Sequence, residues 1–191
     1  WAMGRSALQV IGPPGTARLH KRLLMYPYQS DIEYRLSLGR SPEGILDIDI
    51  TEFEPGVIFD EYGLQVRAVP VIHSTYTVAM RFDYIGQSIV HSGDTTYTPD
   101  LVELARGADI LVHDACMSPA AAFRGDSAWP HLFEHLKRHH ATPEEAGRTA
   151  REAGVRKLVL THFLNATDFD ETISRCRTEF DGEIIIGDDL M

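Results

Sequence analysis

From about residue 95 onward, short apolar runs alternate with segments that carry helix start and stop signals, and this alternation most constrains the fold. The apolar runs, which predict buried strands, lie at residues 110–112, 158–160 and 184–186. The predicted helices begin at residues 98, 142 and 168. Thr142 opens a capping box with Glu145, and Gly154 is expected to end that helix. Thr98 is expected to cap the helix that starts with Pro99. Strands and helices in alternation predict helices packed against a sheet.

The first half of the chain has the period-2 alternation of β-strands instead. It is clearest at residues 45–53, which read Ile-Leu-Asp-Ile-Asp-Ile-Thr-Glu-Phe. Further strands are predicted at residues 9–11, 57–59, 64–72, 76–84 and 88–90. A helix is predicted from Thr16 to Met25 after a Gly-Pro-Pro-Gly turn, and residues 26–43 are predicted to be a loop or lid. The strands are expected to form an antiparallel meander, so the chain is predicted to be α+β.

Length and composition narrow the class of protein. The 191 residues suit one domain, predicted to span residues 1–191, and contain no apolar run long enough to cross a membrane. A formal net charge of −10 argues against a protein that coats nucleic acid through a broad basic face. It leaves open a nucleic-acid enzyme whose metal ions supply positive charge locally. Two cysteines, Cys116 and Cys176, do not make a disulfide framework, so we expect a cytoplasmic protein.

Four predicted strands are followed, within four residues, by histidine or aspartate. His73 follows the strand that ends at residue 72, and Asp94 follows the strand that ends at residue 90. His113 and Asp114 follow residues 110–112, and His162 follows residues 158–160. Side chains at strand ends are exposed by the loop and held by the rigid strand, so catalytic groups tend to lie there.

Histidine and carboxylate side chains are ligands for zinc and similar divalent ions. A carboxylate can also bridge two metal ions about 3.5–4 Å apart. Taken alone, each of these residues is more often a hydrogen-bonded polar side chain at a strand end, because isolated histidine matches are weak evidence. Four such strand ends in a chain with nine histidines favour a metal site.

These residues belong to an ordered set of short motifs that resembles the metallo-β-lactamase superfamily. The motifs are V-I-H-S at residues 71–74, S-G-D-T at 92–95, V-H-D-A at 112–115, H-A-T-P-E-E-A at 140–146 and L-T-H-F at 160–163. The set is most similar to the branch of ribonuclease Z and of related arylsulfatase-like and phosphodiesterase-like hydrolases, and it covers nearly the whole chain. The resemblance implies an αββα sandwich of two sheets with helices outside.

The resemblance also implies a role for each matching residue. His73 would be a ligand of one metal ion, Asp94 would bridge two, and His162 would bind the second. The two divalent ions would be zinc, with manganese or iron as alternatives. His140 would protonate the leaving group, and Asp114 would orient His140, because a carboxylate beside an imidazole favours its protonated form and fixes its tautomer. The branch usually has glutamate at this acidic position (H-E-A-T), whereas this chain reads H-D-A-C.

Two departures from the family pattern bear on function. The H-x-H-x-D-H motif, which supplies four ligands in the family, is absent and is expected upstream of Trp1, so the domain is expected to be incomplete at its N-terminus. The long tRNA-binding arm of bacterial ribonuclease Z would fall between Phe82 and Ser88, where only a few residues occur. The resulting prediction is a dinuclear phosphodiesterase, acting on phosphodiester or ester substrates that include RNA, and a homodimer. The alternatives are an arylsulfatase, lactonase or aryl esterase, or a non-catalytic interaction domain that has lost its metals.

Other histidines, cysteines and serines allow competing interpretations. His131 and His135 flank Glu134 in H-x-x-E-H, the inverted zinc-protease motif, and His139 would continue the same helix face. A solvated or lid helix explains this pattern better, because five-residue matches are often false. Cys116 is expected to be a buried, inert thiol. A structural role is expected for His91, no supporting context surrounds His20, and Ser74 and Ser92 lack a nucleophile-elbow context.

Overall fold

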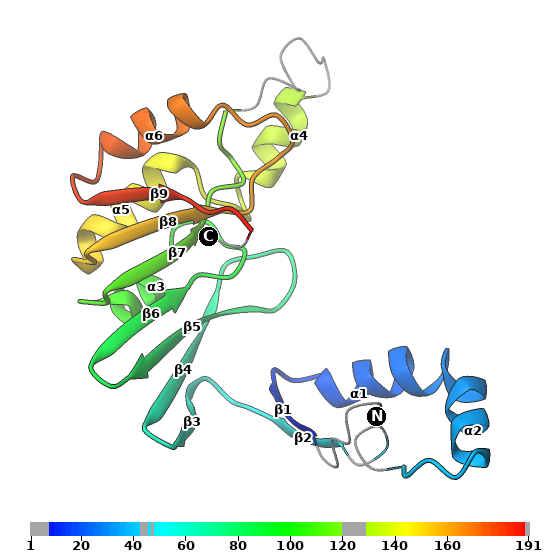
Figure 1. The fold of residues 1–191 in the computed structure, drawn as a ribbon. Helices are drawn as coiled ribbons and strands as arrows, with labels where there is room; N and C mark the ends of the chain where they lie inside the picture. The colour runs from blue at the N-terminus through cyan, green and yellow to red at the C-terminus, as the bar shows by residue number, and fades with distance from the viewer. Residues whose placement is uncertain (1–7, 43–45, 47, 120–128, 190–191) are drawn as a thin grey trace. The chain divides into compact units, whose positions relative to one another are not determined.

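The computed structural model describes residues 8–42, 46, 48–119 and 129–189. The chain divides into two compact units, Trp1–Glu54 and Pro55–Met191, which are treated separately here (Figure 1). The single domain over residues 1–191 stays a prediction. No helix within the described ranges is long and apolar enough to cross a membrane.

The first unit contains two strands and a series of helical turns. Its elements are β1 (Leu8–Gly12), α1 (Thr16–His20), the π-helical turn η1 (Lys21–Met25), α2 (Gln29–Ser37) and β2 (Ile48–Glu52). The predicted strand at 9–11 and the helix at 16–25 are therefore confirmed, and the described part of residues 45–53 contains the predicted strand. Oε1 of Glu52 accepts hydrogen bonds from the N–H groups of Gly15 and Ala17, at 3.0 and 2.9 Å. This carboxylate at the N-terminus of α1 satisfies amides that have no partner within the helix.

Two predictions for this first unit are wrong. Residues 26–43 were predicted to be a loop or lid, but α2 occupies residues 29–37. Side-chain pairs four residues apart support this helix, because Arg35 Nε donates to Asp31 at 2.7 Å and Gln29 Nε2 donates to Glu33 at 2.8 Å. β1 and β2 pair in parallel and not in the expected antiparallel meander. The helical segments between them provide the crossover that a parallel pair requires.

The second unit is built on a seven-stranded mixed sheet. Its strands are β3 (Gly56–Glu61), β4 (Leu64–Val71), β5 (Thr77–Tyr84), β6 (Gln87–His91), β7 (Ile110–Asp114), β8 (Lys157–Thr161) and β9 (Glu183–Ile186). They lie in sequence order across the sheet. The pairs from β3 to β6 are antiparallel, and the pairs from β6 to β9 are parallel. Every strand predicted in this region is present.

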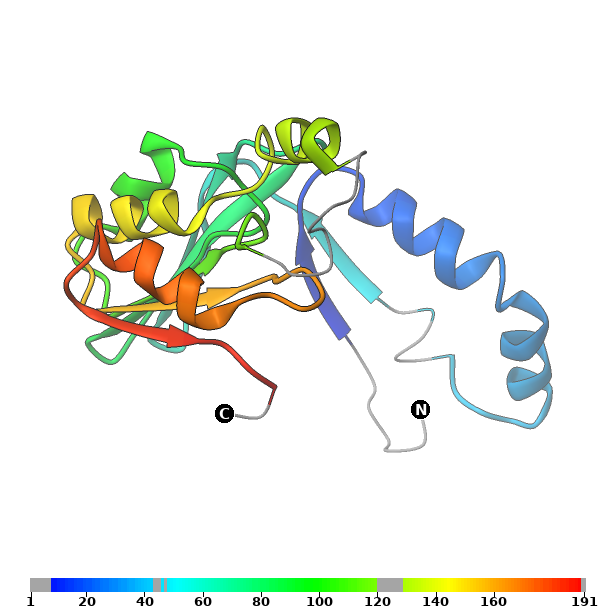
Figure 2. The ribbon, with the colours of Figure 1, turned by 90° about the horizontal axis from the view of Figure 1, so that it is seen from above.

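Three helices cover one face of this sheet. They are α3 (Pro99–Ala105), α5 (Pro143–Ala153) and α6 (Phe169–Arg177); a further helix, α4 (Trp129–Leu136), precedes α5 (Figure 2). α3 packs on β4 and β5, α5 on β7 and β8, and α6 on β9, with α5 between the other two helices. The core between helices and sheet includes Leu101, Leu111 and Leu158, each with no exposed surface.

The helix boundaries test the predicted caps. Thr142 and Glu145 form both bonds of the capping box, and Gly154 follows α5 in the left-handed conformation, so these predictions are confirmed. Thr98 lies at the N-cap of α3, but its side chain accepts no bond from that helix. Its predicted capping role is therefore wrong, although Pro99 begins the helix as expected.

Strand directions explain why the predicted site residues meet. β4 and β6 are both antiparallel to β5, so they run in the same direction, and β7 and β8 are parallel to β6. The carboxyl ends of these four strands therefore lie at one edge of the sheet. His73, Asp94, Asp114 and His162 are at or just after these ends, which is where open sheets of this kind bind ligands.

Candidate active site

Backbone and hydroxyl hydrogen bonds tie the loop after β6 to its neighbouring strands. The N–H of Ser92 donates to the carbonyl oxygen of Val112 at 2.9 Å. The N–H of Ile72 donates to Oγ1 of Thr95 at 3.2 Å, and the N–H of Thr96 donates to the Ile72 carbonyl oxygen at 3.4 Å. The loop that carries Asp94 is therefore fixed against the segment that carries His73.

Gly93 allows the chain to turn sharply just before Asp94. Its φ angle is +64°, and a Cβ atom there would lie 2.8 Å from the carbonyl oxygen of Val78 and 2.9 Å from Cγ2 of Thr77. Both the left-handed backbone and the close approach to β5 require a residue without a side chain. Asp94 owes its position at the sheet edge to this glycine.

Asp94 and His162 are in direct contact. Nδ1 of His162 lies 2.6 Å from Oδ1 of Asp94, and the two side chains are 40% and 42% exposed. Since a carboxylate only accepts, this nitrogen carries the proton, which leaves Nε2 as the nitrogen that can bind a metal ion. His162 has a φ angle of +62°. Such a conformation costs a non-glycine residue about 1–3 kcal/mol and is concentrated at functional sites.

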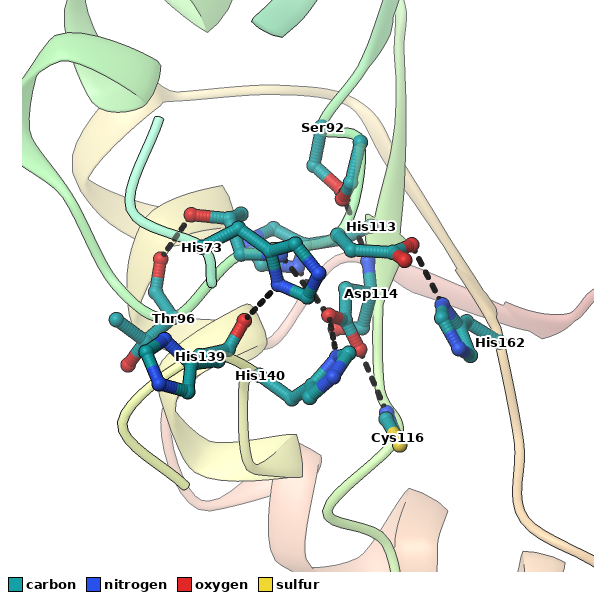
Figure 3. A network of polar contacts seen from close by, with 12 residues as sticks. His73, Ser92, Thr96, His113, Asp114, Cys116, His139, His140 and His162 are labelled. Carbon is teal, nitrogen blue, oxygen red and sulfur yellow. Dashed lines mark hydrogen bonds and ion pairs between the residues drawn. The ribbon is translucent and has the colours of Figure 1, made fainter. Parts of the chain in front are cut away.

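Asp114 is almost fully buried, and three groups donate to its carboxylate. Oδ2 accepts from the N–H of Thr95 at 3.0 Å and from Nδ1 of His140 at 2.8 Å. Oδ1 accepts from the N–H of Cys116 at 2.7 Å. The backbone N–H of Asp114 donates in turn to Oγ of Ser92 at 3.0 Å. This network, shown in Figure 3, holds the His140 imidazole in one tautomer and one orientation.

Five imidazole rings form a chain of neighbouring rings from His135 on α4 to His162 after β8. Neighbouring rings meet edge to face, with centroid separations of 5.6 Å for His135–His139, 5.9 Å for His139–His73, 4.9 Å for His73–His140 and 5.2 Å for His140–His162. Nδ1 of His73 donates to the carbonyl oxygen of His139 at 3.1 Å (Figure 3). This bond leaves Nε2 as the nitrogen of His73 that could bind a metal ion, and the ring lies between those of His139 and His140.

Two groups of side chains have the spacing of a metal site. In one, the donor atoms of Cys116, His140 and His162 all lie within 4.8 Å of one another; in the other, those of Asp94, Asp114 and His162 do. Asp114 already accepts three hydrogen bonds, so its geometry suits an orienting carboxylate better than a ligand. Neither group includes His73, which contacts the site through the His140 ring.

Cys116 is a candidate functional residue that the sequence did not reveal. It is 3% exposed, and the neighbouring N–H of Met117 donates to the carbonyl oxygen of Ala141 at 3.1 Å. This bond joins the loop after β7 to the segment that carries His140, and so brings the thiol to the site. Burial, together with the negative charges of Asp114 and Asp94, raises the pKa of the Cys116 thiol to about 12. The only sequence signal of this position is the H-D-A-C motif, in which Cys116 comes two residues after Asp114.

The remaining histidines have different positions. His113 is fully buried, its Nδ1 donates to the Asp114 carbonyl oxygen at 2.8 Å, and burial lowers its pKa, so it stays neutral. His131 and His135 are exposed on α4, which ends at Leu136. His139 therefore lies beyond the helix, and its predicted place on the same helix face is wrong. Nδ1 of His91 accepts from the N–H of Gly93 at 3.0 Å.

Comparison with known proteins places this geometry in a family. Residues 4–163 match the family described as Beta-lactamase superfamily domain. Ribonuclease Z of Mycobacterium marinum is 34% identical over 198 residues, covering 100% of this chain and 68% of the relative. Ribonuclease Z of Mycobacterium avium is 34% identical over 188 residues, covering 96% and 65%. The chain thus spans about two thirds of the length of these curated relatives.

Solved structures show the same fold at lower identity. The metallo-β-lactamase fold protein YhfI from Bacillus subtilis has a TM-score of 0.65 and 22% identity, over 96% of this chain and 64% of that one. The short form of human tRNase Z has a TM-score of 0.59 and 18% identity, over 99% and 68%. The expected fold class and the resemblance are both confirmed. The chain belongs to the β-lactamase superfamily, as a hydrolase of the metallo-β-lactamase fold that resembles ribonuclease Z.

Proposed function

We propose that the protein hydrolyses phosphodiester bonds with two divalent metal ions and the Asp114–His140 pair. One observation carries the proposal: an imidazole oriented by a buried carboxylate lies beside a candidate metal ligand. His140 is bonded to Asp114 at 2.8 Å, and its ring is 5.2 Å from that of His162. A proton donor next to a metal site is the arrangement that assisted cleavage of a phosphate ester requires.

The side chains present fit a divalent metal. His73, Asp94 and His162 supply imidazole and carboxylate donors at one sheet edge, and Asp94 already contacts His162 at 2.6 Å. In the proposal His73 would hold one ion, His162 would hold the other, and Asp94 would be a ligand of both. Zinc is the proposed metal, with manganese and iron as alternatives on the same donors. When bound, such a pair of ions activates water and neutralises charge on the phosphoryl oxygens.

The protein side chains perform the proton transfer and the positioning. Nδ1 of His140 donates to Asp114, so Nε2 is the nitrogen that faces the substrate. In the protonated imidazole, Nε2–H passes its proton to the leaving oxygen as the phosphorus–oxygen bond breaks. Asp114 keeps the ring in place throughout and stabilises its positive charge. Since His73 is bonded to the carbonyl oxygen beside His140, the two rings are held as one unit.

RNA is the proposed substrate class, because the similar curated proteins are named ribonuclease Z. β5 and β6 are joined by the two-residue turn Ile85-Gly86, with φ angles of 47° and 73°. That turn is a tight hairpin and leaves no arm at this position. The proposed substrates are therefore short RNA segments and small diesters. Sulfate esters, lactones and aryl esters are the alternatives on the same site, and a homodimer is the proposed assembly.

Metal content and hydrolysis, measured on the protein expressed from its complete gene, test this function. Plasma mass spectrometry is expected to find about two metal ions per chain. Hydrolysis of bis(p-nitrophenyl) phosphate is expected to need those ions and to be lost in Asp94→Ala. Asp100→Ala, which removes an exposed carboxylate from α3, is the matched control and is expected to keep both metal and activity.

A substrate panel separates the alternatives. Equal amounts of protein are given bis(p-nitrophenyl) phosphate, a short single-stranded RNA, p-nitrophenyl sulfate, a lactone and p-nitrophenyl acetate. Highest kcat/KM on the two diesters supports the proposal, and highest kcat/KM on another substrate replaces it with that reaction. Absence of both bound metal and metal-stimulated hydrolysis would reject the enzyme in favour of a binding module.

A further inference from the structure

We infer that Cys116, His140 and His162 form a second cation site, selective for thiophilic divalent ions such as zinc and cadmium, whose occupation inhibits the enzyme. This donor set shares His162 with the metal ligands proposed for catalysis and takes His140 from the proposed proton-donor pair, and it adds the Cys116 thiol. The inhibitory effect rests on the proposed function. The binding of the ion rests on the three side chains alone.

The three donor atoms are close enough to bind one ion. They all lie within 4.8 Å of one another. In a tetrahedral zinc site with bonds of about 2.3 Å to sulfur and 2.0–2.1 Å to nitrogen, the donors are separated by about 3.3–3.6 Å. Binding one ion therefore requires the donor atoms to approach one another by at most about 1.5 Å.

The surroundings hold two of the donors in place and leave an entrance beside the third. Cys116 and His140 are 3% and 7% exposed, whereas the His162 side chain is 40% exposed. The N–H of Cys116 is bonded to Oδ1 of Asp114 at 2.7 Å, and the same carboxylate holds His140 through Oδ2 (Figure 3). One buried carboxylate thus holds both the backbone of Cys116 and the imidazole of His140.

Both imidazoles have the hydrogen-bonding pattern of metal-binding histidines. Nδ1 of His140 donates to Asp114, and Nδ1 of His162 donates to Asp94. A carboxylate on the distal nitrogen of a ligating histidine fixes its tautomer and increases the basicity of the other nitrogen. Nε2 of each ring is therefore the ligand atom. The two carboxylates also supply negative charge beside the bound cation.

Thiolate and imidazole together select the ion. Sulfur ligands favour zinc, cadmium and similar soft or borderline ions, whereas manganese and magnesium prefer oxygen. On binding, the Cys116 thiol releases its proton to solvent and the sulfur bonds to the cation, with no change in oxidation state. His140 can then no longer protonate a leaving group, and His162 is withdrawn from the catalytic set. Excess zinc or cadmium is expected to inhibit, and excess manganese is not.

Cobalt absorption tests the site without reference to activity. Co²⁺ added to the protein expressed from its complete gene is expected to give a near-ultraviolet sulfur-to-cobalt charge-transfer band. Cys116→Ser is expected to abolish the band, and Cys176→Ser is expected to retain it. Cys176 is the matched control, because it is also fully buried but lies on α6. A wild-type protein without the band, or a band that persists in Cys116→Ser, overturns the inference.

Thiol protection provides a measurement that needs no variant. Wild-type protein is treated with a small alkylating reagent with and without cadmium, and modification of each cysteine is measured by peptide mass spectrometry. Cadmium is expected to slow the modification of Cys116 at least about tenfold relative to that of Cys176, which corresponds to 1.4 kcal/mol. Equal rates with and without cadmium at Cys116 overturn the inference.

Inhibition separates this inference from the proposed function. In Cys116→Ser, the zinc concentration that halves hydrolysis of bis(p-nitrophenyl) phosphate is expected to rise about tenfold relative to its value in the wild type. A cobalt–sulfur band in a protein without hydrolysis would support the cation site and reject the proposed function. Hydrolysis in a protein that shows no cobalt–sulfur band would support the proposed function and reject the cation site.

Discussion

The carboxylate of Asp114 binds His140 on one oxygen and the backbone N–H of Cys116 on the other, at 2.8 and 2.7 Å. It also accepts the N–H of Thr95 at 3.0 Å and has almost no exposed surface. All three partners are donors, so an acceptor-only side chain is the group that satisfies them. Asp114 thus holds the His140 ring, as the positioning role proposed for it requires.

Asp114→Asn is expected to lower kcat for bis(p-nitrophenyl) phosphate by about 10²–10⁴-fold, with little change in KM. The amide NH₂ of asparagine must face at least one donor, which misplaces the His140 ring and leaves a buried mismatch. Kinetics over a range of pH are the measurement, and the limb that reports the acid is expected to be lost. Asp114→Glu, which keeps the carboxylate, is expected to recover part of kcat. An unchanged kcat in Asp114→Asn contradicts the assigned role.

Gly93→Ala is expected to destabilise the protein by about 2–5 kcal/mol, from backbone strain together with overpacking. The added Cβ would lie 2.8 Å from the Val78 carbonyl oxygen. Gly107→Ala is the matched control, because Gly107 has nearly the same φ angle, +63°, and open space around it. It is expected to cost about 1–2 kcal/mol. Urea unfolding measures the free energy of unfolding of both variants. Equal losses in that free energy would show that the contact of Gly93 with β5 does not add to the cost.

Thr142→Ala is expected to cost about 0.5–2 kcal/mol, because it removes the side-chain oxygen of the capping box. Oγ1 of Thr142 accepts from the N–H of Glu145 at 3.3 Å, and the Glu145 carboxylate accepts from the N–H of Thr142 at 2.9 Å. Thr178→Ala, an exposed site after α6, is the control and is expected to cost less. Thermal unfolding measures the melting temperatures of both variants, and equal melting temperatures for Thr142→Ala and Thr178→Ala would contradict the prediction.

Asp83→Asn is expected to lower the melting temperature at about pH 7, and to lower it less as the pH falls below the ordinary carboxyl pKa of 3.8. A hydrogen bond from Arg81, 3.0 Å from Asp83, holds the pKa of the Asp83 carboxyl below its ordinary 3.8. The stabilisation is therefore present above the unfolded-state pKa and is lost as pH falls through the lower folded-state value. Asp181→Asn, at an exposed residue, is the control. A difference between wild type and Asp83→Asn that stays constant over the whole pH range contradicts this origin.

The sequence predicted the second unit well because its signals are local. The capping box at Thr142, the stop at Gly154 and the apolar runs each depend on a few neighbouring residues. The strand-end positions of His73, Asp94 and His162 could be predicted for the same reason. The structure adds the direction of the strands, which brings these ends to one edge of the sheet.

The wrong predictions depend on contacts that a local pattern does not contain. α2 exposes Tyr34 and is followed by the exposed Leu38, so it lacks the apolar stripe by which a helix is recognised. The parallel pairing of β1 with β2 joins residues 40 positions apart. The place of Cys116 depends on a bond between Met117 and Ala141, and the left-handed backbone of His162 has no sequence signal.

The four parallel strand ends have a kinetic consequence. Asp94 and His162 are separated by 68 positions, and His73 and the His139 carbonyl by 66. Closing loops of this length is slow compared with forming local turns and hairpins, so the site is completed only when most of the second unit has folded. A partly folded chain is therefore expected to lack an assembled pair of the proposed metal ligands, and cation binding during refolding is expected to report the last stage of assembly.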